Sequence, residues 1–124
     1  MNPTTALPIP MLPDAVLAPV ANPELRAFAA EALAHARSAW ELFWQHPPGR
    51  SVHDLALDYD HIVAWITAVY RRHLYTLVIR EKPVTVQGKA ADGIVVINPL
   101  EALVDKLTLD IAKYERRIRL GVGY

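Results

Sequence analysis

The sequence predicts a mainly α-helical fold, with three helices and a small β-hairpin between the second and the third. Three observations support this class. Apolar residues recur every three or four positions along three long stretches. An Asn-Pro pair, a typical helix start, precedes two of them, at Asn22-Pro23 and at Asn98-Pro99. Only residues 84–97 contain strand-like apolar runs. The second and third helices should form a long antiparallel pair.

Length and composition indicate one folded domain. The chain has 124 residues, of which 52% are hydrophobic and 21% charged. Because it has no cysteine, disulfides and thiolate metal sites are excluded. No targeting or membrane-spanning pattern is seen, so a soluble intracellular protein is expected. Residues 1–60 hold three Arg or Lys against seven Asp or Glu, whereas residues 61–124 hold ten against six. A polyanion should therefore prefer the second half.

Residues 1–21 are predicted to form a Pro-rich N-terminal arm. A single helical oligomerisation domain is predicted over residues 22–124. The arm contains five prolines, which remove backbone donors and fix φ, so an extended segment and no helix is predicted. It is either a disordered tail or a strap on a neighbouring subunit.

The first helix is predicted from Asn22-Pro23 to about Gln45, ended by His46-Pro47-Pro48-Gly49. Its apolar face changes from alanines to large aromatic residues along its length. The aromatic residues could stack on bases, but no basic residues alternate with them, which favours packing in a core or an interface. The candidate interface residues here are Trp40 and Trp44.

The second helix is predicted from a capping box at Ser51–Asp54 to Arg80 or Glu81. Its apolar surface is so broad that contact with another subunit is expected to cover part of it. Asp54, Asp58 and His61 share one face and could hold a divalent metal, but a full site needs further ligands that the sequence does not supply. A solvated acidic first turn, favoured by the helix dipole, is the ordinary explanation.

The region at about 83–98 is predicted to form the hairpin, with strands at 84–87 and 94–97. The second strand is apolar on both faces, so helices or neighbouring hairpins must cover it. The hairpin therefore supplies further oligomerisation candidates: Val84, Val86, Ile94, Val95, Val96 and Ile97.

The third helix should begin after Asn98-Pro99, with Asn98 as the N-cap, and end before Gly121. Both long helices begin with acidic and end with basic residues. In an antiparallel pair, the basic end of each would lie beside the acidic start of the other.

The basic residues of the second half allow two interpretations. They could complement helix dipoles and pair across the helices, or they could contact nucleic-acid phosphates. The candidates for DNA contact rest on charge alone: Arg71, Arg72, Arg80, Lys82, Lys89, Arg116, Arg117 and Arg119.

Over residues 25–124 the chain resembles the small terminase subunit of tailed double-stranded-DNA bacteriophages. The resemblance rests on the order of these segments: Trp44-Gln45-His46, Asp58-Tyr59, Tyr70, Ile79-Arg80-Glu81-Lys82-Pro83-Val84, Gly88-Lys89, Asn98-Pro99-Leu100 and Arg119-Leu120-Gly121-Val122-Gly123. It implies a non-enzymatic ring-shaped homo-oligomer without a cofactor. It also implies that the protein binds viral DNA in the host cytoplasm and delivers it to the large terminase subunit, an ATPase and nuclease.

The chain departs from many such proteins, because a Pro-rich arm stands where they carry a helix-turn-helix and no charged tail follows Gly123. Two other functions remain open. One is a structural head-completion or connector protein that oligomerises without recognising DNA. The other is a small metal-dependent enzyme using Asp54, Asp58 and His61.

Overall fold

A computed structural model describes residues 9–17, 20–45, 58–87 and 94–120 of the chain. It confirms the mainly α-helical class. In chain order the elements are α1 (Asp14–Leu17), α2 (Pro23–Gln45), α4 (Tyr59–Glu81), β1 (Val84–Gln87), β2 (Ile94–Ile97) and α5 (Leu100–Leu120).

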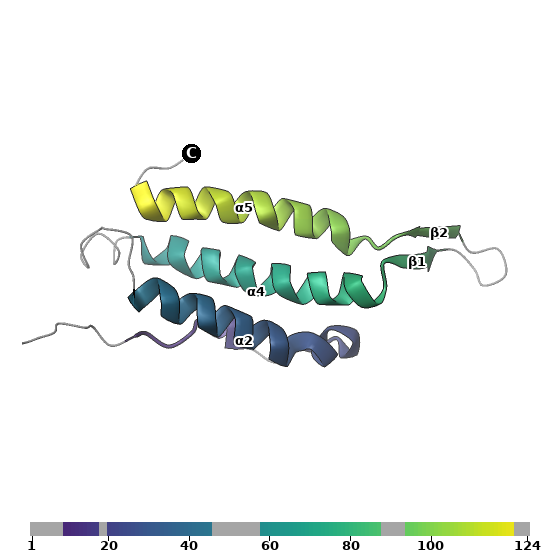
Figure 1. The fold of residues 1–124 in the computed structure, drawn as a ribbon, viewed down its shortest axis with the longest axis horizontal. Coiled ribbons are helices and arrows are strands. Elements are labelled where there is room, and N and C mark those ends of the chain that lie inside the picture. The colour runs from purple at the N-terminus through teal and green to yellow at the C-terminus, as the bar shows by residue number, and fades with distance from the viewer. Residues whose placement is uncertain (1–8, 18–19, 46–57, 88–93, 121–124) are drawn as a thin grey trace, which may run out of the picture.

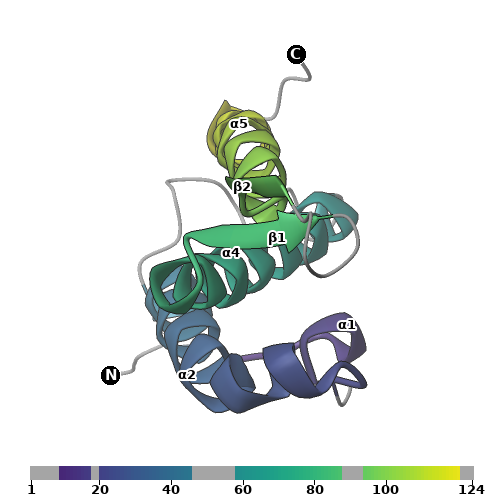
Figure 2. The same ribbon diagram turned by 90° about the vertical axis from the view of Figure 1, so that its right-hand side faces the viewer.

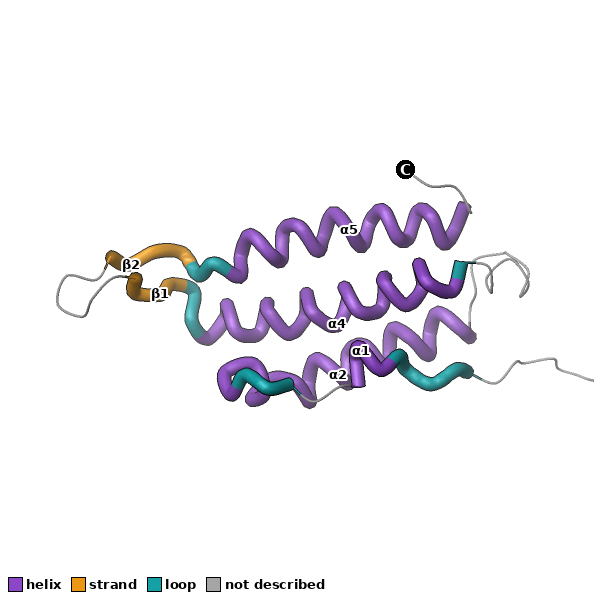
Figure 3. Tube along the Cα trace, turned by 180° about the vertical axis from the view of Figure 1, so that it is seen from behind, coloured by secondary structure: helices purple, strands orange, loops and turns teal. Residues whose placement is uncertain are grey.

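The three long helices lie side by side in one layer with α4 in the middle (Figure 1). Seen along the layer, α5 lies on one side of α4 and α2 on the other (Figure 2). Neighbouring helices are antiparallel, so α2 and α5 run in the same direction. The two strands extend from one end of the layer, beyond the end of α4 and the start of α5 (Figure 3).

Helix α2 occupies the range that its sequence signals predict. The carbonyl of Asn22 accepts a hydrogen bond from the Arg26 amide at 2.9 Å, which closes the first turn. The Arg26 guanidinium also donates to the Val20 and Ala21 carbonyls, at 3.0 and 2.8 Å, and so ties the preceding segment to the helix. The predicted stop at residues 46–49 lies outside the described residues.

Helix α4 lies at the centre of the hydrophobic core. Other helices of the same chain cover its broad apolar surface. The expectation that another subunit must cover part of this surface is therefore wrong. As the middle helix of the layer, α4 meets α2 on one side and α5 on the other, so residues around much of its circumference are buried. These residues are Ile62, Trp65, Ile66, Ala68, Val69, Tyr70, Leu74, Leu77 and Val78. Helix α4 begins at Tyr59, with Asp58 at the N-cap position, so the predicted start at Ser51–Asp54 is wrong. Residues 51–54 themselves lie outside the described residues.

The described part of the arm corrects the prediction of an extended segment without helix. Residues 14–17 form a helical turn, in which the Pro13 carbonyl accepts hydrogen bonds from the Val16 and Leu17 amides. Leu12 and Val16 are buried in the core. The indole Nε1 of Trp40 donates to the Pro10 carbonyl at 2.7 Å. The arm folds onto its own chain because Trp40 supplies both apolar surface and a donor for a proline-rich backbone.

Strands β1 and β2 pair antiparallel, with Val84 opposite Ile97 and Gln87 opposite Ile94. Buried Asn98 connects the two strands to α4 and α5. Its Oδ1 accepts from the Leu100 amide at 3.0 Å, as the predicted N-cap of α5 should. Its Nδ2 donates to the Lys82 carbonyl at 2.8 Å, just after α4. The connection at 88–93 and the predicted C-cap Gly121 lie outside the described residues.

No helix in the described part of the chain is both long and apolar enough to cross a membrane.

Candidate functional site

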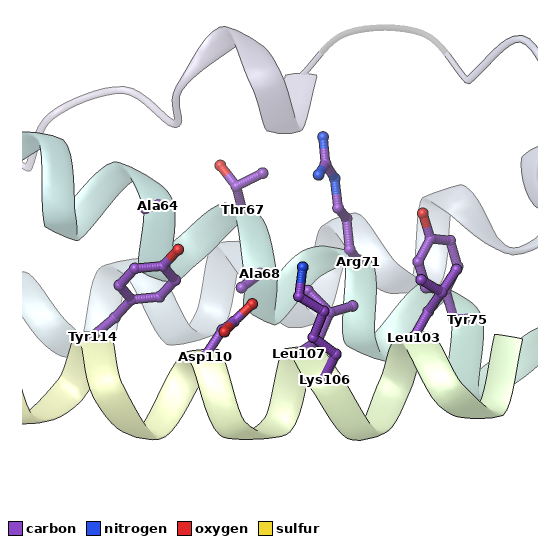
Figure 4. A pocket seen from close by; sticks show the side chains of 10 residues that line it. All are labelled: Ala64, Thr67, Ala68, Arg71, Tyr75, Leu103, Lys106, Leu107, Asp110 and Tyr114. Atoms are coloured by element: carbon purple, nitrogen blue, oxygen red, sulfur yellow. The ribbon is translucent and has the colours of Figure 1, made fainter.

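An open groove of about 380 Å³ runs between α4 and α5 (Figure 4). We call it the α4–α5 groove. Helix α4 contributes small side chains, one arginine and one tyrosine, and α5 contributes leucines, charged residues and a second tyrosine. The lining residues are Ala64, Thr67, Ala68, Arg71 and Tyr75 from α4, with Leu103, Lys106, Leu107, Asp110 and Tyr114 from α5.

Two cationic side chains, one from each helix, stand at the mouth of this groove. Arg71 and Lys106 are both exposed, and both point to the same side in Figure 4. Neither forms an ion pair with any residue in the described ranges. Asp110 lines the groove one helical turn beyond Lys106, outside salt-bridge distance of either cation. The arrangement suits an oxygen-rich anion above an apolar floor.

Arg117, another predicted DNA contact, has a structural partner. Its Nη2 and Nε donate to Oδ1 of Asp58 at 3.1 and 3.3 Å. Asp58 is only 4% exposed and lies at the N-cap position of α4. The basic end of α5 thus meets the acidic start of α4, as the antiparallel arrangement predicts. The pair holds the two helices together, and its arginine is engaged within the protein.

The other basic candidates do not form one patch. Arg72 lies close enough to α2 for its charge to affect the pKa of His35. Arg80 and Lys82 are exposed at the strand end of the layer, whereas Arg116 is exposed at the opposite end. Arg119 lies in the last turn of α5, and Lys89 lies outside the described residues.

The aromatic candidates belong mainly to the chain's own core. Trp40 is 1% exposed, so the expectation that it contacts another subunit is wrong. Half-buried Trp44 packs edge to face against Trp40 and Phe43, with ring centroids 5.6 and 5.0 Å apart. For the strand candidates at 84–87 and 94–97, the structure gives the backbone pairing described above.

The alternative metal trio is not assembled in the described part of the chain. Asp58 is engaged by Arg117, and Asp54 lies outside the described residues. Among the described ranges, no group of three His, Asp or Glu side chains is placed to hold a metal ion.

Two histidines stack between α2 and α4. The rings of His35 and His73 lie 4.1 Å apart and 10° from parallel, and His73 Nε2 lies 3.8 Å from a carboxylate oxygen of Glu31. Much of His35 reaches solvent, but His73 covers one face of its ring. Burial of this kind lowers the pKa of His35 from its ordinary 6.5, and the charges of His73 and Arg72 lower it further.

This histidine pair predicts a loss of stability in mild acid. Because the pKa of His35 is lower in the folded state, the unfolded state takes up the proton more readily. The stabilisation is complete above pH 6.5 and is lost as the pH falls through the lowered pKa. Urea unfolding between pH 7.5 and about 5 should show a decline that His35→Gln flattens. An unchanged pH dependence in this variant would contradict the assignment.

Sequence reasoning missed Lys106, the second cation of the groove. In the sequence it stands alone between Asp105 and Leu107 and belongs to no basic cluster. The helical period places it near Asp110 and Leu103, but not beside Arg71. The proximity of Lys106 to Arg71 depends on how α4 and α5 align, and no local sequence signal predicts that alignment.

Fold and site together define a three-helix layer with a cationic groove between its central and C-terminal helices. Comparisons of the chain with protein-family models, with curated proteins and with solved structures found no match.

Proposed function

We propose that this protein is a non-catalytic adaptor for viral DNA packaging, of the small terminase type. In this proposal it forms a ring of identical subunits, binds duplex DNA through phosphate contacts, and delivers the DNA to a large terminase subunit. The observation that carries the proposal is the pair of cations, Arg71 and Lys106, at the α4–α5 groove without an ion-pair partner among the described residues.

The charge argument favours phosphate as the ligand of these cations. Most basic side chains at helix ends can be explained by helix dipoles or by pairs such as Arg117–Asp58. Arg71 lies in the middle of α4 and Lys106 in the second turn of α5, so neither is in the last turn, where the helix dipole would stabilise a cation. Two neighbouring cations repel each other unless an anion lies between them, and phosphate oxygens provide one without requiring a particular base sequence.

The segment that carries the family resemblance also has a definite structural role. Asn98 caps α5 and binds the chain leaving α4, so it fixes where the third helix begins relative to the second. This supports Asn98-Pro99-Leu100 as a structural signature of the helical pair, in the position that the resemblance implies.

DNA binding by the groove is testable with a short fluorescent duplex titrated at several salt concentrations. Each phosphate contact contributes about 0.9 to the slope of log K against log salt. We therefore expect Arg71→Ala and Lys106→Ala each to reduce the slope by about 1 and to weaken binding to all sequences alike. Arg37→Ala, which removes an exposed arginine from α2, is the matched control and should leave the slope unchanged.

An unchanged slope in the Arg71→Ala/Lys106→Ala double variant would contradict the groove as the DNA site. Absence of DNA binding by the wild-type oligomer, even at low salt, would contradict the packaging role. That second result would favour a structural head-completion or connector protein instead.

A further inference from the structure

The α4–α5 groove contains more than its two cations. Tyr75 of α4 and Tyr114 of α5 line it at opposite ends (Figure 4). Both are half-buried, so part of each ring packs against the core and the remainder faces the groove. Between them the lining includes Ala68 and Leu107, which are apolar. An intact duplex offers phosphates to the cations, but its bases are stacked and paired and cannot reach these rings.

Aromatic rings beside cations are the combination by which proteins hold single-stranded nucleic acid. Each base has a flat face that stacks on an aromatic side chain, while the cations contact the backbone. The aromatic residues around Trp40 lack neighbouring cations in the sequence, whereas the groove has both kinds of residue. Arg71 lies one helical turn before Tyr75 on α4, and Lys106 lies two turns before Tyr114 on α5.

A carboxylate in the groove also favours a base over a second phosphate. Half-buried Asp110 lies between Lys106 and Tyr114 on α5, one helical turn from each. Its negative charge repels phosphate, so it has no part in the backbone contact. It can accept hydrogen bonds from base N–H groups, such as the amino group of cytosine. The whole Watson–Crick edge is available for such bonds only on an unpaired base.

We infer that the α4–α5 groove binds a single-stranded stretch of DNA, with backbone phosphates on Arg71 and Lys106 and bases stacked on Tyr75 and Tyr114. This inference rests on the proposed function, because both assign the two cations to phosphate. It adds the state of the DNA that the groove accepts, which is a run of unpaired nucleotides such as an extension from a duplex end.

The dimensions of the groove favour linked nucleotides over a free one. Leu103, at the Tyr75 end of the groove, and Tyr114 are eleven residues apart on α5, which is about 16 Å along the helix axis (Figure 4). One base cannot stack on both rings, so filling the two ends takes two bases of one strand. The groove is open along its length, so a strand enters it without a rearrangement of the helices.

Three fluorescent DNA probes test the inference: a blunt duplex, the same duplex with a short unpaired extension, and the extension alone as a single strand. Each is titrated with the full chain at one salt concentration, and binding is followed by anisotropy. We expect the extension to tighten binding of the duplex at least about 5-fold, the lower limit for stacking one base on an aromatic side chain. Tyr75→Leu/Tyr114→Leu should remove most of this gain and leave the affinity for the blunt duplex unchanged.

Two control variants separate stacking from a structural role of the tyrosines. Tyr75→Phe/Tyr114→Phe keeps both rings and should keep the gain. Tyr59→Leu removes an exposed tyrosine at the start of α4, outside the groove, and should also keep it. Equal wild-type affinity for the blunt and the extended duplex would overturn the inference and leave the proposed duplex binding intact. A gain that survives the double leucine variant would also overturn it.

Competition with a free deoxynucleoside monophosphate tests whether the site takes a strand. We expect no displacement of the labelled single strand at concentrations where the same strand, unlabelled, displaces it. Displacement by the monophosphate at those concentrations would overturn the inference and indicate a pocket for a free nucleotide. A wild-type protein that binds none of the three probes would overturn the proposed function together with the inference.

Discussion

Replacing Trp40 with alanine is expected to lower the free energy of unfolding by about 3–5 kcal/mol, the range for deleting a buried aromatic side chain. Trp40 is almost fully buried where α2, α4 and the arm meet. Its removal leaves a cavity against Trp44 and takes away the donor that binds the Pro10 carbonyl. Urea denaturation followed by circular dichroism measures the effect without relying on tryptophan fluorescence.

Trp40→Phe separates the two contributions of this residue. It keeps most of the apolar volume but cannot donate to Pro10, so we expect a smaller loss of about 1–2 kcal/mol. Limited proteolysis should then cleave the arm within residues 9–17 faster than in the wild type. If Trp40→Ala cost less than about 1 kcal/mol, the arm and α2 could not share the core described above.

Replacing Arg117 with methionine is expected to cost about 1.5–3 kcal/mol, because it removes the charged hydrogen bonds to buried Asp58. The upper values reported for broken buried ion pairs do not apply, since the arginine is partly exposed. Arg37→Met, the same change at an exposed site on α2, should cost about 0.5 kcal/mol or less. Urea midpoints provide the comparison.

A double variant tests whether the cost arises from an unpaired charge. Asp58→Asn combined with Arg117→Met removes both charges, so it should recover part of the stability lost in Arg117→Met alone. If the two changes were simply additive, Asp58 would be stabilised mainly by groups other than Arg117.

The starts of α2 and α5 could be predicted because they depend on local chemistry, whereas α4 begins at Tyr59 and not at the predicted Ser51–Asp54. Asn22-Pro23 starts α2, and Asn98 caps α5 through its own side chain. Residues 84–87 and 94–97, which the sequence marks as strand-like, have paired strand backbone in the structure. Such signals involve neighbours within a few residues, and a single sequence contains them in full.

The remaining features depend on contacts between distant segments. The arm lies against its own chain because Trp40 binds the Pro10 carbonyl and Val16 is buried in the core, which proline content alone does not indicate. The broad apolar surface of α4 suggested a second subunit, because its central position in the layer is a property of the tertiary fold. Lys106 lines the same groove as Arg71 only because of how α5 aligns with α4 in the folded chain.

Native mass spectrometry of the full chain, with and without a short duplex, tests the central claim most directly. The account predicts a discrete higher oligomer of one subunit number, which gains the mass of the duplex and loses it as salt is raised. A protein that remains monomeric at micromolar concentration, with or without the duplex, would contradict it.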